Sequence, residues 1–426
     1  MTELHQLSAS VAAKKIQANE LKSEDLIRSC IERIREREPI TQAWVETNFD
    51  AAIERARYLD RSANLGPLHG IPFGAKDLFD THDFPTRLGS PIYENNRPSS
   101  DAVHIALMRQ AGGVLLGKTV TTEFATFKGG KTTNPHNPEY TPGGSSSGSA
   151  AAVADDMIPL ATGSQTAGSV IRPAAFCGVV GYKPTYGKVS LGGVKSLSPS
   201  LDTLGSFSRT VADAALCVAA MSGDHQLATI HKMKHKPRIA TCLTYDGELA
   251  STETITAIHH AALLAEDVFK TQVPAIELPT IFKDMSALQG RIMWSESARS
   301  FSFEQNNHSE QLSQQLKGLI KLGSAITYEQ YSNDLIIAEK ARALIDQLLT
   351  GSWDILIAPS AIGEPTKGLT QTGDPIFCRV WTLMGLPCIT LPLYTGPNHL
   401  PVGVQLVAAR GRDALLLSVA DALMSA

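Results

Sequence analysis

The sequence predicts an α/β fold, because apolar runs of strand length alternate with longer segments whose apolar residues recur at helical spacing. The 426 residues are 43% hydrophobic and 19% charged, which suits a large core and differs from the composition of disordered proteins. With 38 Lys and Arg against 42 Asp and Glu, the net charge is −4. No global positive field attracts a nucleic-acid backbone, so we expect a small-molecule partner and no nucleic acid.

The elements can be assigned in chain order. Ser23 and the two acidic residues after it resemble a helix cap and first turn. Residues 74–77 read as a strand end or loop, and residues 128–148 and 162–169, rich in Gly, Ser and Thr, as loops. Helices are expected at residues 8–19, 23–37, 49–61, 103–110, 149–154, 252–269, 283–300 and 329–349, and strands at 113–116, 237–243, 353–358, 388–393 and 402–408. The alternation without a linker predicts one domain of residues 1–426 with a largely covered sheet.

The compartment is expected to be the cytoplasm. The six cysteines are far apart, form no C-x-x-C pair and mostly lie in apolar runs, which predicts buried thiols in a reducing compartment. Residues 1–15 lack the charged and apolar regions of a secretory signal. No run of about 18 uncharged apolar residues is present, so we expect no membrane segment.

Two short motifs suggest chemistry that their context does not favour. Residues 112–119 (GGVLLGKT) match the phosphate-binding loop G-x-x-x-x-G-K-[ST], but an expected helix precedes them and apolar residues fill the interior. Nucleotide binding would make Lys118 essential for activity and Ser169 dispensable. Residues 144–148 (GSSSG) match G-x-S-x-G, which exposes a nucleophilic serine, here Ser146, between a strand and a helix. The residues before it make a poor strand, and neither His308 nor His399 lies in a context that indicates a catalytic base.

A third set of residues spans three segments: Lys76 in GAKD, the serine run at 143–149 (GGSSSGS), and residues 165–173 (QTAGSVIRP). This set resembles the amidase signature family, in which a G-G-S-S-[GS]-G-S run precedes a G-[DQ]-T-[GA]-G-S segment. Further segments are similar to those of the family: LHGIPF at 68–73, NPHNP at 134–138, FCGVVGYKPT at 176–185, SLDTLG at 200–205, GLP at 385–387 and LPVGVQLV at 400–407. The likeness covers roughly residues 65–210, a catalytic core, and 353–425, but not 220–350.

The resemblance implies a central mixed β-sheet covered by helices on both faces, and roles for three side chains. Ser169 would be the nucleophile, Ser145 a bridging hydroxyl, and Lys76 the base that drives proton transfer through Ser145. Lysine is charged at pH 7 unless burial lowers its pKa, and the apolar neighbours of Lys76 predict such burial. The family also implies a cis Gly144–Ser145 peptide and an oxyanion hole made by the backbone N–H groups of Thr166, Ala167, Gly168 and Ser169.

Other charged and polar residues have two interpretations each. Arg172 could bind a substrate carboxylate, although bracing of the loop is favoured, and Arg209 has the same ambiguity. His231 and His235 have the i, i+4 spacing of metal ligands but lack an acidic third ligand, which indicates a surface turn. We expect no metal and no cofactor.

The expected function is hydrolysis of the C–N bond of a small amide through a serine acyl-enzyme. Family members act on amides, anilides, carbamates and urea-derived compounds, and some on esters. Residues 220–350, with Met293, Trp294, Phe301 and Phe303, would cover the catalytic face or serve the core. Gln165 and Ala167 stand where many members have Asp and Gly, which favours a free-standing amidase over the alternative, the family's subunit of the glutamyl-tRNA amidotransferase. A homodimer would be common for such an enzyme.

Overall fold

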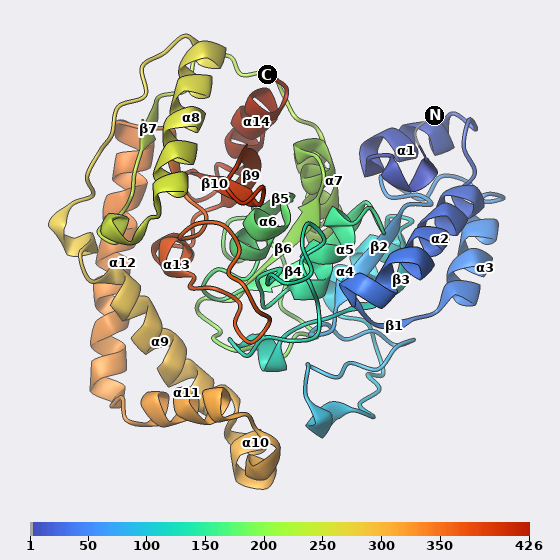
Figure 1. Ribbon diagram of the computed structural model, residues 1–426, viewed down its shortest axis with the longest axis horizontal. Coiled ribbons are helices and arrows are strands. Elements are labelled where there is room, and N and C mark those ends of the chain that lie inside the picture. The colour runs from blue at the N-terminus through green and yellow to red at the C-terminus, as the bar shows by residue number, and fades with distance from the viewer. Residues whose placement is uncertain (1–2) are drawn as a thin grey trace.

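The molecule is built on one mixed ten-stranded β-sheet, shown by the computed structural model, which describes residues 3–426 (Figure 1). Met1 and Thr2 of the predicted domain lie outside the described residues. The strand order is β1-β3-β2-β4-β6-β5-β9-β10-β8-β7. The strands are β1 (Trp44–Thr47), β2 (Pro72–Lys76), β3 (Val114–Thr119), β4 (Leu160–Gln165), β5 (Val180–Lys183), β6 (Thr203–Ser208), β7 (Ile239–Thr241), β8 (Ile355–Pro359), β9 (Cys388–Thr395) and β10 (Pro401–Val407).

The pairing confirms the expected mixed sheet. β2 runs parallel to both β3 and β4, and β7 runs parallel to β8, while the other neighbours are antiparallel. Every residue of β2, β3, β4, β6, β8 and β10 is buried. Successive side chains of a strand point to opposite faces, so helices must cover both faces of the sheet.

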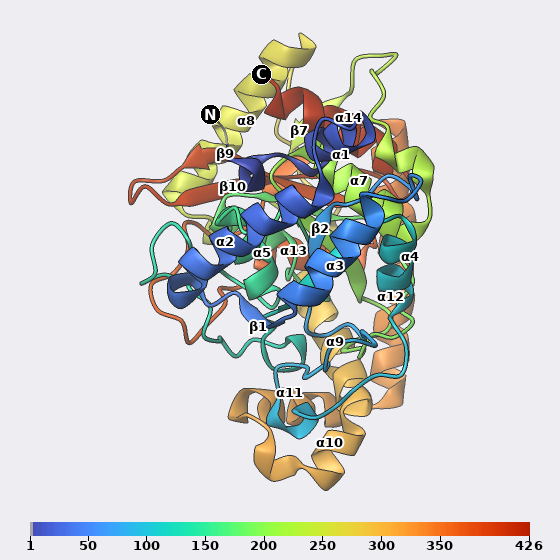
Figure 2. The same cartoon turned by 90° about the vertical axis from the view of Figure 1, so that its right-hand side faces the viewer.

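Fourteen α-helices surround the sheet within the described residues (Figures 1 and 2). Both views place α10 and α11 at one end of the molecule, while α2 and α3 lie beside β2 and β3. The helices are α1 (Ala9–Gln17), α2 (Ser23–Thr41), α3 (Phe49–Leu59), α4 (Val103–Gln110), α5 (Ser147–Ala154), α6 (Ile171–Cys177), α7 (Val211–Ser222), α8 (Thr252–Phe269), α9 (Met285–Ser300), α10 (Ser302–Asn307), α11 (Gln314–Ser324), α12 (Tyr328–Gly351), α13 (Ile376–Leu383) and α14 (Asp413–Met424).

The start of α2 differs from the sequence prediction in its cap. The N-cap residue is Lys22, and Ser23 is the first residue of the helix. The carboxylate of Asp60 accepts hydrogen bonds from the N–H groups of Ser23 (2.7 Å) and Glu24 (3.1 Å), while the Ser23 hydroxyl donates to the Gly70 carbonyl. A side chain distant in sequence thus satisfies the free N–H groups of the first turn, which local sequence alone does not reveal.

Two segments that carry site residues belong to strands: residues 74–76 form a strand end, one of the two structures expected there, whereas residues 162–165 were expected to be a loop. Lys76 ends β2, and residues 162–165 of the expected loop belong to β4. β4 pairs along its whole length with β6, from Leu160 opposite Ser208 to Gln165 opposite Thr203. Pairing within a sheet overrides the low strand propensity of Gly and Ser here.

Two further expectations concern membrane-spanning segments and the cysteine thiols. No helix of residues 3–426 is both long and apolar enough to cross a membrane. All six cysteines are buried and unpaired, which confirms their expected role as small core residues.

Candidate active site

Lys76 lies in the interior of the protein at the carboxyl end of β2. Its side chain has no exposed surface, and its Nζ donates to Ser145 Oγ at 2.7 Å and to Ser164 Oγ at 2.8 Å. Burial lowers the pKa of Lys76 to about 7, and the charge of Asp202 opposes that shift. The predicted burial is confirmed, and a substantial fraction of the amine is uncharged near neutrality. Ser164 was missed by the sequence analysis because it appeared to be one more polar residue of a loop.

The peptide bond between Gly144 and Ser145 is cis, as expected. A Cβ atom on Gly144 would lie 2.6 Å from Cγ2 of Thr372, so no larger residue fits without a shift. Arg172 donates to the Gly144 carbonyl at 2.7 Å and to the Thr372 carbonyl at 2.7 Å, and is almost completely buried. Bracing by Arg172 is therefore confirmed, while its binding of a substrate carboxylate stays a prediction.

Ser169 lies in the turn between β4 and α6. Gln165 closes this turn: its Oε1 accepts from the N–H groups of Val170 (2.9 Å) and Ile171 (3.0 Å). The amide of Gln165 thus satisfies N–H groups at the start of α6, a task that needs an acceptor and no charge. Ser169 is 9% exposed, and its hydroxyl makes no hydrogen bond with residues 3–426, Ser145 included.

Three carbonyl groups of this turn are anchored, while the N–H groups of its middle residues have no partner among residues 3–426. Thr166 O accepts from Gln289 Nε2 (2.9 Å), Ala167 O from Thr382 Oγ1 (2.8 Å), and Gly168 O from the backbone N–H at position 172 (2.9 Å). Within the described chain, the N–H groups of Ala167, Gly168 and Ser169 donate to no acceptor. Fixed carbonyls hold these donors in place, which is the arrangement that an oxyanion hole requires.

Asp202 supports the turn from the side of β6. Its carboxylate accepts from Thr166 Oγ1 (2.5 Å), Ser196 Oγ (2.7 Å) and the N–H groups of Leu197 and Ser198. Burial raises the pKa of Asp202, and these donors oppose the shift. The sequence placed Asp202 in a family-like segment but gave it no role.

The middle of the chain contacts the turn of Ser169 through α9. Gln289 is fully buried and holds the Thr166 carbonyl. Met293 and Phe301 are buried and Trp294 is partly buried, whereas Phe303 is 54% exposed. Of the four aromatic and sulfur side chains considered in the sequence analysis, three thus pack in or against the core. Gln289, whose contact with the Thr166 carbonyl supports the turn, was missed by the sequence analysis.

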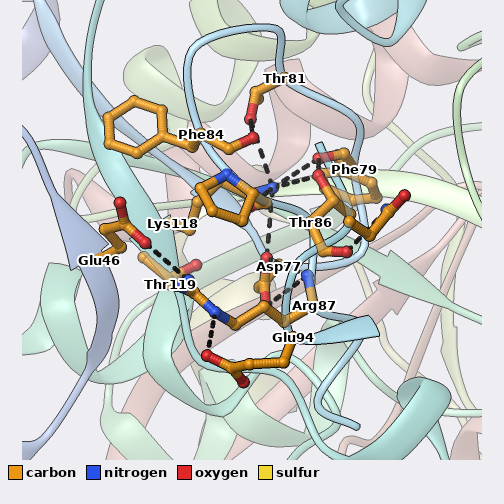
Figure 3. Close-up of polar contacts among 12 residues, drawn as sticks. Glu46, Asp77, Phe79, Thr81, Phe84, Thr86, Arg87, Glu94, Lys118 and Thr119 are labelled. Carbon is orange, nitrogen blue, oxygen red and sulfur yellow. Dashed lines mark hydrogen bonds and ion pairs between the residues drawn. The ribbon is translucent and has the colours of Figure 1, made fainter. Parts of the chain in front are cut away.

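Lys118 is a core residue, and the nucleotide-binding interpretation of its motif is wrong. Lys118 lies in β3, and its Nζ donates to Phe79 O (2.7 Å) and Thr86 Oγ1 (2.8 Å) and lies 3.2 Å from Asp77 Oδ1 (Figure 3). Both charged side chains are buried, and Arg87 also donates its backbone N–H to Asp77. The ion pair fixes the chain that follows Lys76, and no free N–H cradle for phosphates exists in a paired strand.

Replacing Lys118 by methionine is expected to destabilise the fold by about 3–5 kcal/mol, because Asp77 would keep a buried carboxylate without its cation. The Asp77→Asn/Lys118→Met double variant is expected to regain most of that loss. Urea unfolding followed by circular dichroism measures both. A loss below about 1 kcal/mol for Lys118→Met would contradict the structural role.

The remaining sequence candidates lie outside this site. Ser146 is buried, and its hydroxyl is 3.4 Å from both the O and the N of Ser164, which indicates a structural residue. Arg209 donates to four backbone carbonyls and so braces the N-terminal segment. His231 and His235 are exposed, as expected of a surface turn. Elsewhere His82, Asp83 and Asp101 lie close together, with both carboxylates paired to Arg109.

Comparisons with known proteins give one consistent result. The model of the amidase family matches residues 25–417. One subunit of the glutamyl-tRNA(Gln) amidotransferase of Endomicrobium trichonymphae is 30% identical over 472 residues, which cover 99% of this chain and 97% of that protein. A crystal structure of an amidase superposes with a TM-score of 0.88 at 28% identity over 98% and 99% of the two chains. The peptide amidase of Stenotrophomonas maltophilia gives a TM-score of 0.83 at 27% identity over 99% and 96%.

Proposed function

Because the chain belongs to the amidase signature family, we propose that it hydrolyses the C–N bond of a small amide through an acyl-enzyme on Ser169. The contact that carries this proposal is the 2.7 Å hydrogen bond between Lys76 Nζ and Ser145 Oγ, two residues that are fully buried. An amine whose pKa is about 7 can accept a proton at neutral pH, and a hydroxyl bonded to it can accept one proton while donating another.

The reaction then runs in two halves. Ser169 Oγ attacks the amide carbonyl as its proton passes to Ser145 Oγ, while the Ser145 proton passes to Lys76 Nζ. The N–H groups of the turn bind the oxyanion. Collapse breaks the C–N bond, and the proton held by Lys76 returns through Ser145 to the leaving amine. Water next attacks the acyl-enzyme by the same relay and releases the acid and free Ser169. The relay requires the Ser169 hydroxyl to turn toward Ser145 when substrate binds.

Labelling of the nucleophile tests the proposal. The purified protein is treated with a fluorophosphonate reagent, and the adduct is located by mass spectrometry. We expect the label on Ser169 and its loss in Ser169→Ala. A label on Ser146 would favour the strand–turn–helix hydrolase instead, and a protein without any label would leave the proposal unsupported. A panel of aryl amides, aliphatic amides, carbamates and esters then defines the substrate class.

A second function is favoured by one of the relatives named above. The amidotransferase protein of Endomicrobium trichonymphae matches this chain along nearly its whole length at 30% identity. In that case the chain would release ammonia from an amide for use by partner chains on an aminoacylated tRNA. Co-purification with partner chains and dependence on that tRNA would support it, whereas turnover of simple amides by the lone chain favours a free-standing amidase. Under the first proposal, the enzyme acts on a small substrate, without a cofactor and without nucleic acid. It is then expected to be a homodimer in the cytoplasm.

A further inference from the structure

Arg379 of α13 has a largely buried guanidinium group that lacks a partner. Its side chain is 17% exposed, and its Nε is buried without a hydrogen bond. The nearest carboxylate oxygen among the described residues is Oδ1 of Asp374, 3.9 Å from Nη2 and thus outside hydrogen-bond distance. Asp374 itself is 53% exposed. In contrast, Arg291 of the neighbouring helix α9 binds Asp334 with both of its contacts below 3.0 Å.

A largely buried guanidinium without a counter-ion destabilises the folded state. A buried charge is costly unless an opposite charge and hydrogen bonds compensate it, and planar guanidinium groups fit carboxylates in a bidentate pair. Burial lowers the pKa of Arg379, and only the distant carboxylates of Asp374 and Asp246 oppose the shift. No carboxylate of residues 3–426 lies within hydrogen-bond distance of this guanidinium, so an anion from outside the chain can take that place.

The position of Arg379 relates this anion to the catalytic turn. Its neighbour Cys378 packs on Gly168: a Cβ built on Gly168 would lie 3.1 Å from the Cβ of Cys378. On the other side, Arg379 Nη1 lies 3.2 Å from the place of a Cβ on Gly290, whose neighbour Gln289 holds the Thr166 carbonyl. The guanidinium thus lies against Gly290 of α9, and the residues that precede Gly290 and Arg379 in the sequence, Gln289 and Cys378, contact the turn of Ser169.

We propose that Arg379 binds a carboxylate of the substrate, so that the preferred substrates are amides that also carry a carboxylate. This inference rests on the proposed amide hydrolysis. Arg172 is a weaker candidate for the same task, because it already donates three hydrogen bonds to Gly144 and Thr372. Arg379 makes none through its side chain within residues 3–426, so the whole fork is free for a ligand.

The test compares ω-amido acids, with one to four methylenes between amide and carboxylate, with their methyl esters, for which only release of ammonia is measured. The wild type should prefer one acid of the series over its ester. In Arg379→Gln we expect the ratio of kcat/KM for acid over ester to fall by about 10–100-fold, mainly through KM, because a charged hydrogen-bond pair is lost. Arg379→Lys should give an intermediate ratio, since an ammonium cannot form the bidentate pair.

Two further variants separate recognition from structure. Asp374→Asn removes the competing carboxylate and should lower KM for the acid. Arg291→Gln, which removes a paired arginine from α9, should leave the acid/ester ratio unchanged. An equal loss on acid and ester in both Arg379 variants, or no change in the ratio, would overturn the inference although amide hydrolysis stands. If Ser169 were unlabelled by fluorophosphonate and no amide were cleaved, the proposed function would fail, and the inference with it.

Discussion

Replacing Ser169 by alanine is expected to lower kcat for amide hydrolysis by at least about 10⁴-fold, because removal of the nucleophile of a serine hydrolase leaves only binding and oxyanion stabilisation. The free energy of unfolding should change by less than about 1 kcal/mol. The Ser169 hydroxyl makes no hydrogen bond with the described chain, so its loss leaves no buried partner unsatisfied. Single-turnover kinetics and urea unfolding measure the two quantities.

A matched control is Ser146→Ala, which removes a hydroxyl from the same serine run. Among residues 3–426, the Ser146 hydroxyl has hydrogen-bond partners only in the backbone of Ser164, at 3.4 Å, so we expect activity within about tenfold of the wild type. If Ser146→Ala were inactive and Ser169→Ala active, the nucleophile would have been assigned to the wrong serine. If both variants kept full activity, neither Ser146 nor Ser169 would be the nucleophile.

The sequence was informative where a residue's task is local. α8 begins and ends at the residues expected, since Ser251 caps it and the apolar periodicity runs through its whole length. Lys76 and Ser145 were identified from family-like segments, and their contact in a buried site agrees with that identification. The short apolar segment of β3 was recognised as well, although the expected strand ended at residue 116, three residues before the C-terminal end of β3 at Thr119.

Tasks that depend on distant partners could not be predicted. Ser164 accepts from Lys76 because β4 lies beside β2, and nothing in the local Gly and Ser composition indicates that pairing. Gln289 lies in the segment without family likeness, and Arg379 lies between the short family-like matches near the C-terminus. The positions of both follow from the packing of α9 on α13. Gln165 was identified as a departure from the family, but the helix start that it satisfies appears only in the folded chain.

The second large effect is expected at Lys76. For the wild type, kcat/KM should fall about tenfold for each pH unit below a pKa of about 7, because only the neutral amine accepts a proton from Ser145. Lys76→Met, which keeps the apolar stem, should lower kcat/KM by about 10²–10⁴-fold at pH 8 and remove the acid limb. A variant that retained the limb would show that another group titrates, and Asp202 is the carboxyl group whose charge acts on Lys76.

Unfolding gives an independent measure of the same pKa. In the unfolded chain Lys76 titrates near 10.5, whereas in the folded chain burial lowers its pKa to about 7. Between these values the unfolded chain binds more protons, so the contribution of Lys76 to stability rises with pH from about 7 to about 10.5. Lys76→Met lacks this dependence. Its stability relative to the wild type should therefore increase as pH falls from 10 to 7 and stay constant below 7. A difference independent of pH would mean that the folded chain keeps Lys76 charged, and the serine relay would then lack its base.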